Sequence, residues 1–427
     1  MSKYIPKPFT VLLGKAVKQA AKLRGGGGSA LPGLFVEKID PSFVPNTLAT
    51  LPKGVIVISG TNGKTTTTKI VVSLLESQGL TVFTNKTGSN FVRGVAAALL
   101  SDMTSTGKLK ADIAVLELDE AHAVKFVEKI KPTYSLILNV LRDQLDRFGE
   151  IDTTRSFLED VVKNTTDSVV LNGADARIAS LATSTHADVV YFDLHQSQRH
   201  HFPDDDTLHD SNDQPSAQPD NEALVTLQNF SKDTAEFLIN GTSFSTSLKL
   251  TGAYNIFNSA AALALTLSVL PDANIPSLLT QLSTIEPAFG RGEVLTIEGQ
   301  PLELVLVKNP SGFRLGLSSY SPNGYATLIV INDNYADGRD MSWLWDVDFS
   351  SLKGHPVATA GIRADDMALR LHYNDVPQEF TTQDPKKALR EFLARHKNQP
   401  KRIYCTYTAM LALRKELSTY TKVENVL

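Results

Sequence analysis

Short apolar runs alternate with amphipathic stretches along most of this chain. Strands and helices alternate in this way when helices cover a parallel sheet, and strands buried on both faces are almost wholly apolar. The pattern therefore predicts an α/β fold. The first four predicted strands are VIVIS (55–59), ADIAVLELD (111–119), YSLILN (134–139) and SVVLN (168–172).

A second α/β series follows Phe289, which predicts a domain boundary near residues 288–300. Within it, Asp384 and Pro385 are residue types typical of a helix N-cap and first turn, and an amphipathic stretch follows them. The 427 residues suffice for two or three hydrophobic cores. The predicted strands of this series are ELVLV (303–307), ATLIVIND (326–333), HPVATAG (355–361) and RIYCTYT (402–408).

Two segments depart from this alternation. Residues 195–222 are crowded with Asp, His, Gln, Ser and Pro and contain few large apolar residues, so we expect a mobile polar insert. Residues 9–24 predict a short helix that mixes apolar residues with Lys and Arg. Two interpretations fit that helix: it caps the first domain, or it lies on a membrane surface.

The composition is that of a globular protein, with 42% hydrophobic residues and a formal net charge of −4. This charge provides no overall positive field, so we expect no nucleic acid partner. Cys405 is the only cysteine, which excludes an internal disulfide, and its apolar neighbours predict a buried strand residue. Because we find neither a membrane-spanning run nor a secretory signal, we expect a cytoplasmic protein.

The strongest chemical motif is GTNGKTT at residues 60–66, directly after the strand VIVIS and before a predicted helix over 67–78. Backbone amides of such a loop converge on phosphate oxygens, and the helix N-terminus favours negative charge. Lys64 is expected to neutralise the β- and γ-phosphates, and the Thr65 hydroxyl to reach Mg²⁺. The alternative is a glycine turn with a chance lysine. The loop residues predicted to bind ATP are Gly60, Thr61, Asn62, Gly63, Lys64, Thr65 and Thr66.

An acid at the end of a neighbouring strand usually completes the metal shell of such a site. Glu117 stands at the end of AVLELDE, and Asp119 and Glu120 follow it closely. Spacing alone does not decide which of these carboxylates binds Mg²⁺. A third strand ends at Asn139 and precedes a polar cluster at 142–147. Since ligands bind outside the carboxyl ends of parallel strands, we expect this cluster to face the nucleotide or the acceptor.

Several motifs resemble known families. GTNGKTT, residues 139–150 and GAYNIFNSAA (252–261) resemble the central domain of Mur ligases, while KNPSGF (308–313), residues 332–349 and residues 359–373 resemble the C-terminal domain of the MurT family. The resemblance implies an N-terminal helical extension at 1–45 packed on the central domain. It further implies a Mur ligase-type P-loop central domain with a parallel-rich sheet at 46–290, and a smaller Rossmann-like C-terminal domain at 291–427.

The resemblance also implies a reaction. ATP phosphorylates a carboxylate, and an amine displaces phosphate from the acyl phosphate. For MurT proteins the carboxylate is the α-carboxyl of D-glutamate in lipid II, which becomes D-isoglutamine with ammonia from a GatD-type glutaminase in a heterodimer. Only about fifty residues precede the loop, too few for the domain that holds nucleotide-linked precursors in other Mur ligases. This favours a lipid-carried acceptor at the cytoplasmic face of the membrane.

Further residue roles are implied by the resemblance. Asn255 and Asn258 resemble a family pair at the adenine side of ATP, and Arg291 resembles an arginine near the phosphates. Helix capping for Asn258 and a surface charge for Arg291 are the alternatives.

Asp340 in DGRD resembles the acid thought to complete the glutaminase's catalytic triad across the interface. With Lys64 and Glu117 it forms the predicted catalytic set. A local turn or cap role is the alternative for Asp340, and Asp337 and Asp346 are close enough in sequence to be confused with it.

The chain departs from the family at a zinc ribbon that many MurT proteins carry. Residues 1–404 contain no cysteine, so we expect ATP and Mg²⁺ but no zinc. The alternative zinc ligands are histidines of the 195–222 insert, at 195, 200, 201 and 209, with the aspartates at 204–206. Another departure, from Mur ligases at large, is Gln144 in place of a metal-binding histidine, a glutamine common among MurT proteins.

Two other functions stay open. One is a Mur-type ligase that adds an amino acid, against which the DGRD motif argues. The other is a nucleotide-binding scaffold without catalysis, against which the intact Lys64, Thr65 and Glu117 argue.

Overall fold

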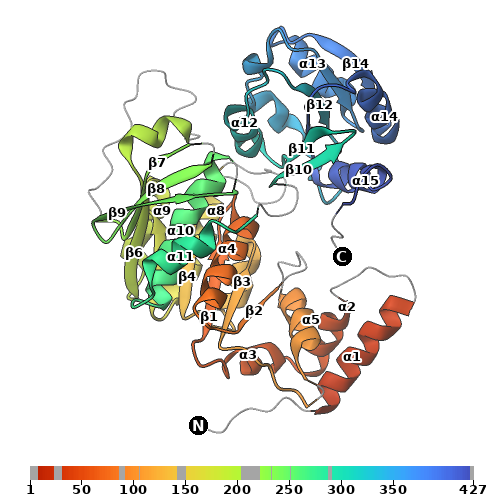
Figure 1. The fold of residues 1–427 in the computed structure, drawn as a ribbon. Coiled ribbons are helices and arrows are strands. Elements are labelled where there is room, and N and C mark those ends of the chain that lie inside the picture. The colour runs from red at the N-terminus through yellow and green to blue at the C-terminus, as the bar shows by residue number, and fades with distance from the viewer. Residues whose placement is uncertain are drawn as a thin grey trace.

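The computed structural model describes residues 8–23, 31–85, 92–104, 106–141, 151–202, 222–231, 233–250, 252–286 and 291–423. The chain builds two sheets, each covered by helices on both faces, and a helical N-terminal unit beside the first sheet (Figure 1). The α/β class predicted from the sequence is confirmed.

The first sheet has nine strands and is mostly parallel. The strands are β1 (Val55–Ser59), β2 (Val82–Thr84), β3 (Ile113–Glu117), β4 (Tyr134–Ile137), β5 (Ser168–Asn172), β6 (Asp188–Leu194), β7 (Val225–Phe230), β8 (Thr234–Ile239) and β9 (Thr242–Ser247). Their spatial order is β2-β3-β1-β4-β5-β6-β7-β8-β9, and the antiparallel pairs among them are β7 with β8 and β8 with β9. The carboxyl ends of β1, β3 and β4 therefore meet at one edge.

Helices cover both faces of this sheet. One layer contains α4 (Lys64–Ser77), α10 (Ala253–Val269) and α11 (Ile275–Leu282); the other contains α5 (Val92–Asp102), α6 (Glu120–Val127) and α8 (Ile151–Asn164). Within β1, Ile58 packs in the first layer and Val57 in the second, and both are fully buried. This is why β1 is apolar at every position before Ser59. Two short turns, α9 (Ala176–Ala179) and η1 (Ser180–Ser184), follow β5.

Three N-terminal helices pack on α5 and on the sheet. They are α1 (Pro8–Leu23), α2 (Leu31–Ile39) and α3 (Phe43–Leu48). Val11 and Phe43 are buried in the core layer that holds Val57, whereas Leu12 is exposed. A Cβ at Gly33 would lie 1.9 Å from the backbone oxygen of Arg93, so α2 and α5 approach closely at this glycine. No helix in the described part of the chain is long and apolar enough to cross a membrane.

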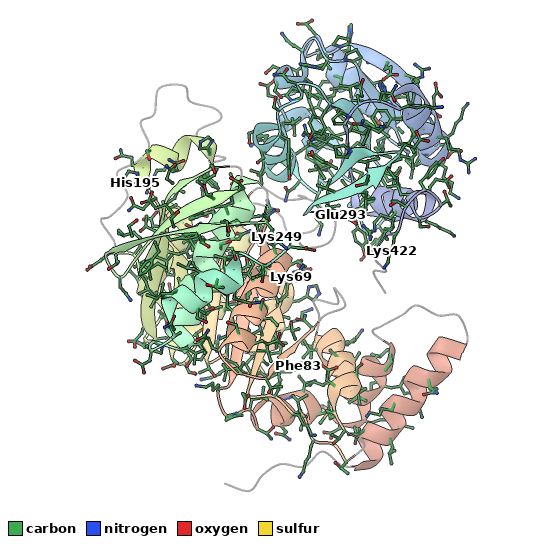
Figure 2. The ribbon with its side chains drawn as sticks, viewed as in Figure 1. Lys69, Phe83, His195, Lys249, Glu293 and Lys422 are labelled. Carbon is green, nitrogen blue, oxygen red and sulfur yellow. The ribbon has the colours of Figure 1, made fainter. Side chains whose placement is uncertain are left out.

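The first part of the predicted polar insert is folded. Residues 196–201 form the 3₁₀ helix η2 (Gln196–His201), and His195 at its start donates its backbone N–H to Leu227 O at 2.9 Å (Figure 2). Phe202 then packs on Tyr254 and Phe257, with ring centroids 4.9 and 5.3 Å away. Phe202 is therefore one of the contacts that fix this segment, together with the ring contact of His201 with Phe230 and the ion pair of Arg199 with Asp193. Residues 203–221 lie outside the described residues.

The second sheet has six strands in the order β10-β11-β15-β12-β13-β14, and only β10 is antiparallel to its neighbour. Helix α12 packs with α13, η3 and η4 on one face, and α14 with α15 on the other. The strands are β10 (Arg291–Ile297), β11 (Gln300–Leu306), β12 (Ala326–Val330), β13 (Val357–Ala360), β14 (Gln378–Thr382) and β15 (Lys401–Cys405). The helices are α12 (Pro310–Ser319), α13 (Ala364–His372), η3 (Ser342–Asp346), η4 (Ser350–Leu352), α14 (Pro385–Arg395) and α15 (Tyr407–Leu417).

Two local predictions for this part are confirmed. The carboxylate of Asp384 accepts hydrogen bonds from the backbone N–H groups of Lys386 and Lys387, at 2.9 and 3.3 Å, and so caps α14. Cys405 lies on β15 and is fully buried, and burial raises the pKa of its thiol.

Candidate active site

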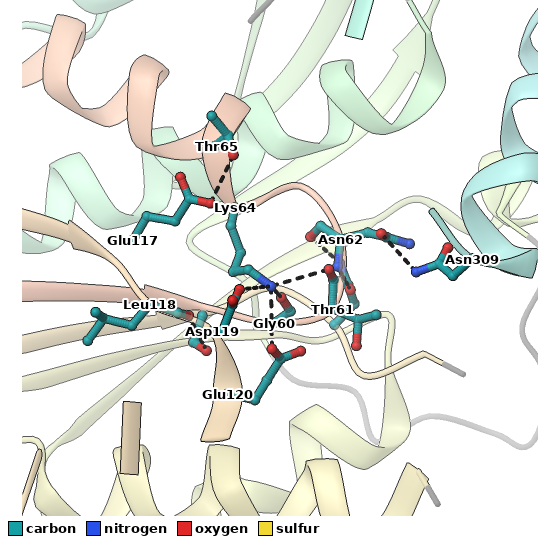
Figure 3. Close-up of polar contacts among 12 residues, drawn as sticks. Gly60, Thr61, Asn62, Lys64, Thr65, Glu117, Leu118, Asp119, Glu120 and Asn309 are labelled. Carbon is teal, nitrogen blue, oxygen red and sulfur yellow. Dashed lines mark hydrogen bonds and ion pairs between the residues drawn. The ribbon is translucent and has the colours of Figure 1, made fainter. Parts of the chain in front are cut away.

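The phosphate loop joins β1 to α4 at the carboxyl-end edge of the first sheet (Figure 3). Gly63, the residue before α4, has φ 90°, a left-handed conformation that side chains other than glycine rarely adopt. A Cβ at Gly63 would also lie 2.7 Å from Nδ2 of Asn258. Asn258 therefore closes this turn on the side where a side chain at position 63 would lie.

Lys64 holds its ammonium group inside this loop. Its side chain is almost wholly buried, and Nζ donates to Gly60 O at 2.5 Å. Nζ also lies 3.3 Å from Oδ1 of Asp119 and 3.4 Å from Oε2 of Glu120, just after β3. Two carboxylates offset the cost of burying this charge. They hold the ammonium at the loop, where phosphate oxygens of a bound nucleotide can take their place.

Thr65 and Glu117 form a second pair beside the loop. The Thr65 hydroxyl donates to Oε1 of Glu117 at 2.9 Å. Glu117 is fixed at the end of β3 because its backbone N–H and C=O both bond to the amide of Asn85, at 3.0 and 2.8 Å. The three acids therefore separate: Glu117 lies with Thr65, while Asp119 and Glu120 pair with Lys64.

These oxygens fit a magnesium ion held jointly with phosphates. Mg²⁺ prefers oxygen ligands and commonly takes one or two from the protein and the rest from phosphates and water. A hydroxyl and a carboxylate oxygen 2.9 Å apart provide such a donor set. Among the described residues, no group of three or more His, Cys, Asp or Glu side chains lies close enough together to hold a metal ion.

Asn139 fastens the loop from the third strand. Its Oδ1 accepts from the backbone N–H of Asn62 at 2.9 Å, and its Nδ2 donates to Asn62 O at 3.0 Å. The backbone N–H of Thr61 also donates to Asn139 O at 3.1 Å. Asn139 is thus a structural clamp on the loop. The polar cluster predicted at 142–147 lies outside the described residues.

The loop opens into a cleft between the two sheet units. The predicted residues Asn255 and Asn258 line it, with Asn258 directly against Gly63. Of the predicted Arg291, only the backbone at the start of β10 is described. The cleft is lined by Asn62, Gly63, Gly252, Tyr254, Asn255, Asn258, Val305, Leu306, Lys308, Asn309, Gly312, Leu315, Gly316, Ser319 and Tyr320.

The second unit contributes side chains that the sequence analysis missed. Lys308, Asn309 and Tyr320 line the cleft, yet KNPSGF served only as a mark of resemblance. A signal was present, because Asn-Pro directly after an apolar strand predicts an N-capped helix at the carboxyl end of that strand. Tyr254 was also missed, and only its position next to Asn255 pointed to it.

Asp340 lies in a different place, in the loop after β12 on the second sheet. Its Oδ1 accepts from the backbone N–H of Ser342 at 2.9 Å, just before η3. It is not among the described residues that line the cleft. Asp337 is buried and accepts from the backbone N–H and hydroxyl of Thr408, at 2.7 and 2.5 Å, which makes it a structural residue. Asp346 ends η3.

Comparisons with known proteins agree with this architecture. The Mur ligase middle domain family matches residues 58–266, and the MurT ligase C-terminal family matches residues 306–410. The subunit MurT of lipid II isoglutaminyl synthase (glutamine-hydrolyzing) from Streptococcus pneumoniae (strain ATCC BAA-255 / R6) is 31% identical over 431 residues, which cover 93% of this chain and 94% of that protein. The Staphylococcus aureus (strain COL) subunit MurT is 29% identical over 392 residues, covering 85% of this chain and 87% of that protein.

Solved structures share the fold. MurF from Acinetobacter baumannii has a TM-score of 0.68 at 16% identity, covering 92% of this chain and 80% of that chain. MurF from Thermotoga maritima in complex with ADP has a TM-score of 0.66 at 16% identity, covering 88% and 83%. Fold and site thus define an ATP-dependent ligase of the Mur ligase class. Given its full-length similarity to the pneumococcal protein, the chain belongs to the MurT family.

Proposed function

We propose that this chain is the synthetase subunit of a lipid II isoglutaminyl synthase. It amidates the α-carboxyl of the D-glutamate in the lipid II stem peptide, with ATP as the energy source and ammonia as the nitrogen source. The observation that carries the proposal is a complete phosphate loop, with Lys64, Thr65 and Glu117 in contact distance of their partners, in a chain similar over almost its whole length to subunits of that name.

Each loop residue has a task in this proposal. The loop amides and Lys64 bind the phosphates of ATP. Asn255 and Asn258, which line the cleft, would take the adenine side that the family resemblance implies. Thr65 and Glu117 would hold Mg²⁺, which supplies positive charge near the phosphates when bound. Lys64 exchanges its bonds to Asp119 and Glu120 for phosphate oxygens and follows the charge of the transferring group.

The reaction has two steps. An oxygen of the substrate carboxylate attacks the γ-phosphorus of ATP, the bond to the β-phosphate oxygen breaks, and ADP leaves. Ammonia then attacks the carbonyl carbon of the acyl phosphate, inorganic phosphate leaves with the carboxylate oxygen, and the nitrogen loses a proton to give the amide. The cleft between the two units favours this order because a site closed over the acyl phosphate keeps water away from it.

The second sheet supplies the partner side of the proposal. Asp340 would orient a histidine of a GatD-type glutaminase, as the acid does in a Cys-His-acid triad. The same unit exposes aromatic side chains: Tyr335 is 82% exposed, Trp345 48% and Tyr373 67%, and the rings of Trp345 and Tyr373 lie 5.4 Å apart. Aromatic residues of this kind are enriched at protein interfaces. They support a heterodimer, which in this proposal acts on lipid II at the cytoplasmic face of the membrane.

The proposal is tested by amidation of a lipid-linked precursor with ATP and ammonium chloride. The mass of the released stem peptide shows replacement of the carboxyl hydroxyl by an amino group, and Lys64→Ala is the inactive control. Product that requires ATP and Lys64 is expected. Addition of a free amino acid instead of ammonia would identify another Mur-type ligase, and absence of product with ammonia or with a glutaminase would point to a scaffold.

A further inference from the structure

Asn309 connects the second unit to the phosphate loop. It is 1% exposed and precedes α12, where its Oδ1 accepts from the backbone N–H of Gly312 at 2.7 Å as the helix N-cap. Its Nδ2 donates to Oδ1 of Asn62, across the boundary between the two units, at 3.4 Å (Figure 3). One side-chain amide thus bonds to a helix N-terminus on one side and to the phosphate loop on the other.

The N-cap decides which way both amides face. Because Oδ1 of Asn309 accepts from Gly312, its NH₂ group must be the one directed at Asn62. Asn62 therefore offers its oxygen to Asn309. Its own NH₂ group is directed elsewhere, and its Nδ2 is buried without a hydrogen-bond partner among the described residues. A buried unpaired donor is costly, which marks Nδ2 as a donor for something that binds here.

The position of this donor identifies the ligand class. Asn62 and Asn309 both line the cleft next to Gly63, in the loop that receives phosphates. The backbone of Asn62 is already fixed by Asn139, which bonds to its N–H and its C=O. Only the amide of Asn62 remains to be oriented, and Asn309 bonds to that amide.

We propose that Asn309 is a positioning residue that orients the side-chain amide of Asn62, so that Nδ2 of Asn62 donates to an oxygen of the bound nucleotide. This inference rests on the proposed nucleotide site. The C-terminal unit then contributes to nucleotide affinity through a phosphate-loop side chain, in addition to the residues with which it lines the cleft.

Two substitutions of Asn309 separate orientation from folding. Asn309→Ser keeps a helix-capping oxygen but cannot reach Asn62. Asn309→Asp keeps the cap and the size, but it places an oxygen where the NH₂ group stood, so the amide of Asn62 turns its NH₂ toward Asp and its oxygen toward the nucleotide. Asn274→Asp is the matched control, because Asn274 caps α11 through Ser277 N at 2.9 Å and is not among the cleft residues.

The measured quantities are the Kd for Mg²⁺-ADP by titration calorimetry and the KM for ATP in the amidation assay. Removal of a hydrogen bond to a charged group is expected to raise both by about tenfold in Asn309→Ser. Asn309→Asp should raise them further, because a carboxylate also repels the phosphates. The KM for the lipid acceptor and the melting temperature should stay close to those of Asn274→Asp.

A double-mutant cycle tests that Asn309 acts through Asn62. In an Asn62→Ala background, Asn309→Ser should cause no further rise in the Kd for Mg²⁺-ADP. Multiplicative effects of the two substitutions would overturn the inference, and so would wild-type affinity in both Asn309 variants. If the wild-type chain binds no Mg²⁺-ADP, the proposed nucleotide site itself is wrong; normal wild-type binding with unaffected variants refutes the positioning role alone.

Discussion

The side chains at the carboxyl-end edges of the two sheets make different kinds of contact. At the first edge, charged side chains meet each other: Lys64 pairs with Asp119 and Glu120, and Glu117 bonds to Thr65. At the second edge, charged side chains pair within their own unit, as Arg363 does with Asp333 and Asp366, and the buried acid Asp337 accepts hydrogen bonds from backbone and hydroxyl donors.

Large aromatic side chains near the second edge are exposed, as Tyr335 shows with 82% of its surface accessible. The difference fits the proposed function, in which the first edge binds a small charged ligand and the second edge contacts the partner subunit. Four changes can break or sharpen this comparison.

The largest effect is expected at Lys64. Lys64→Ala removes the cation that follows the transferring phosphoryl group, so amidation should fall by at least about 1,000-fold with glutamine and with ammonia alike. Lys69→Ala is the control, since Lys69 is an exposed lysine on the same helix (Figure 2). The rates of product formation with both nitrogen sources test this prediction. Activity retained in Lys64→Ala would show that the first edge takes no part in the reaction.

Asp340→Asn should impair the proposed role of the second edge and leave that of the first edge intact. Glutamine-driven amidation by the complex is expected to fall by about 100-fold or more, because the partner's histidine loses its orienting acid, while ammonia-driven amidation stays unchanged. Asp348→Asn is a matched control, because Asp348 makes the same kind of turn with Ser350 N at 2.9 Å. Equal loss with the two nitrogen sources would show that Asp340 serves the fold of this chain instead.

Tyr335→Ala tests the surface of the second edge. Because Tyr335 is largely exposed, its removal should leave the melting temperature unchanged but raise the Kd for the glutaminase by about tenfold. Tyr420→Ala, at a tyrosine 44% exposed in the turn that follows α15, provides the comparison. Surface plasmon resonance gives the Kd of each variant for the glutaminase. A Kd of Tyr335→Ala equal to that of Tyr420→Ala would mean that the glutaminase does not bind at Tyr335.

The smallest effect is expected at Cys405. Burial raises the pKa of this thiol, so at neutral pH it stays protonated and is shielded from reagents. Native protein should therefore not react with Ellman's reagent, and it should keep its amidation activity in the presence of the reagent. The thiol should react only after the protein is unfolded in urea. Rapid reaction in the native state would mean that the core around β15 opens.

Much of this arrangement follows from the sequence. Apolar runs located β1, β3, β4 and β5, because strands buried on both faces need apolar residues at nearly every position. The strand–loop–helix context likewise located Lys64 and Thr65, since a phosphate loop has a local pattern.

Contacts between distant segments could not be predicted from the sequence. Asn309 lies 247 residues from Asn62, and no local pattern predicts that two separately folded units place them together. The different contacts of Glu117, Asp119 and Glu120 depend on how β3 ends and α6 begins, which spacing alone does not fix. The contact of Phe202 with Tyr254 is another example, because it lies at the start of an insert that its composition predicted to be mobile.

The most direct test of the central claim follows an oxygen atom. The stem-peptide glutamate is labelled with ¹⁸O in both α-carboxyl oxygens, and the inorganic phosphate released during ATP- and ammonia-dependent amidation is examined by mass spectrometry. An acyl phosphate requires that one ¹⁸O leaves in each phosphate while the other stays in the amide carbonyl. Phosphate without label, formed together with the amide, would contradict the proposed chemistry at Lys64, Thr65 and Glu117.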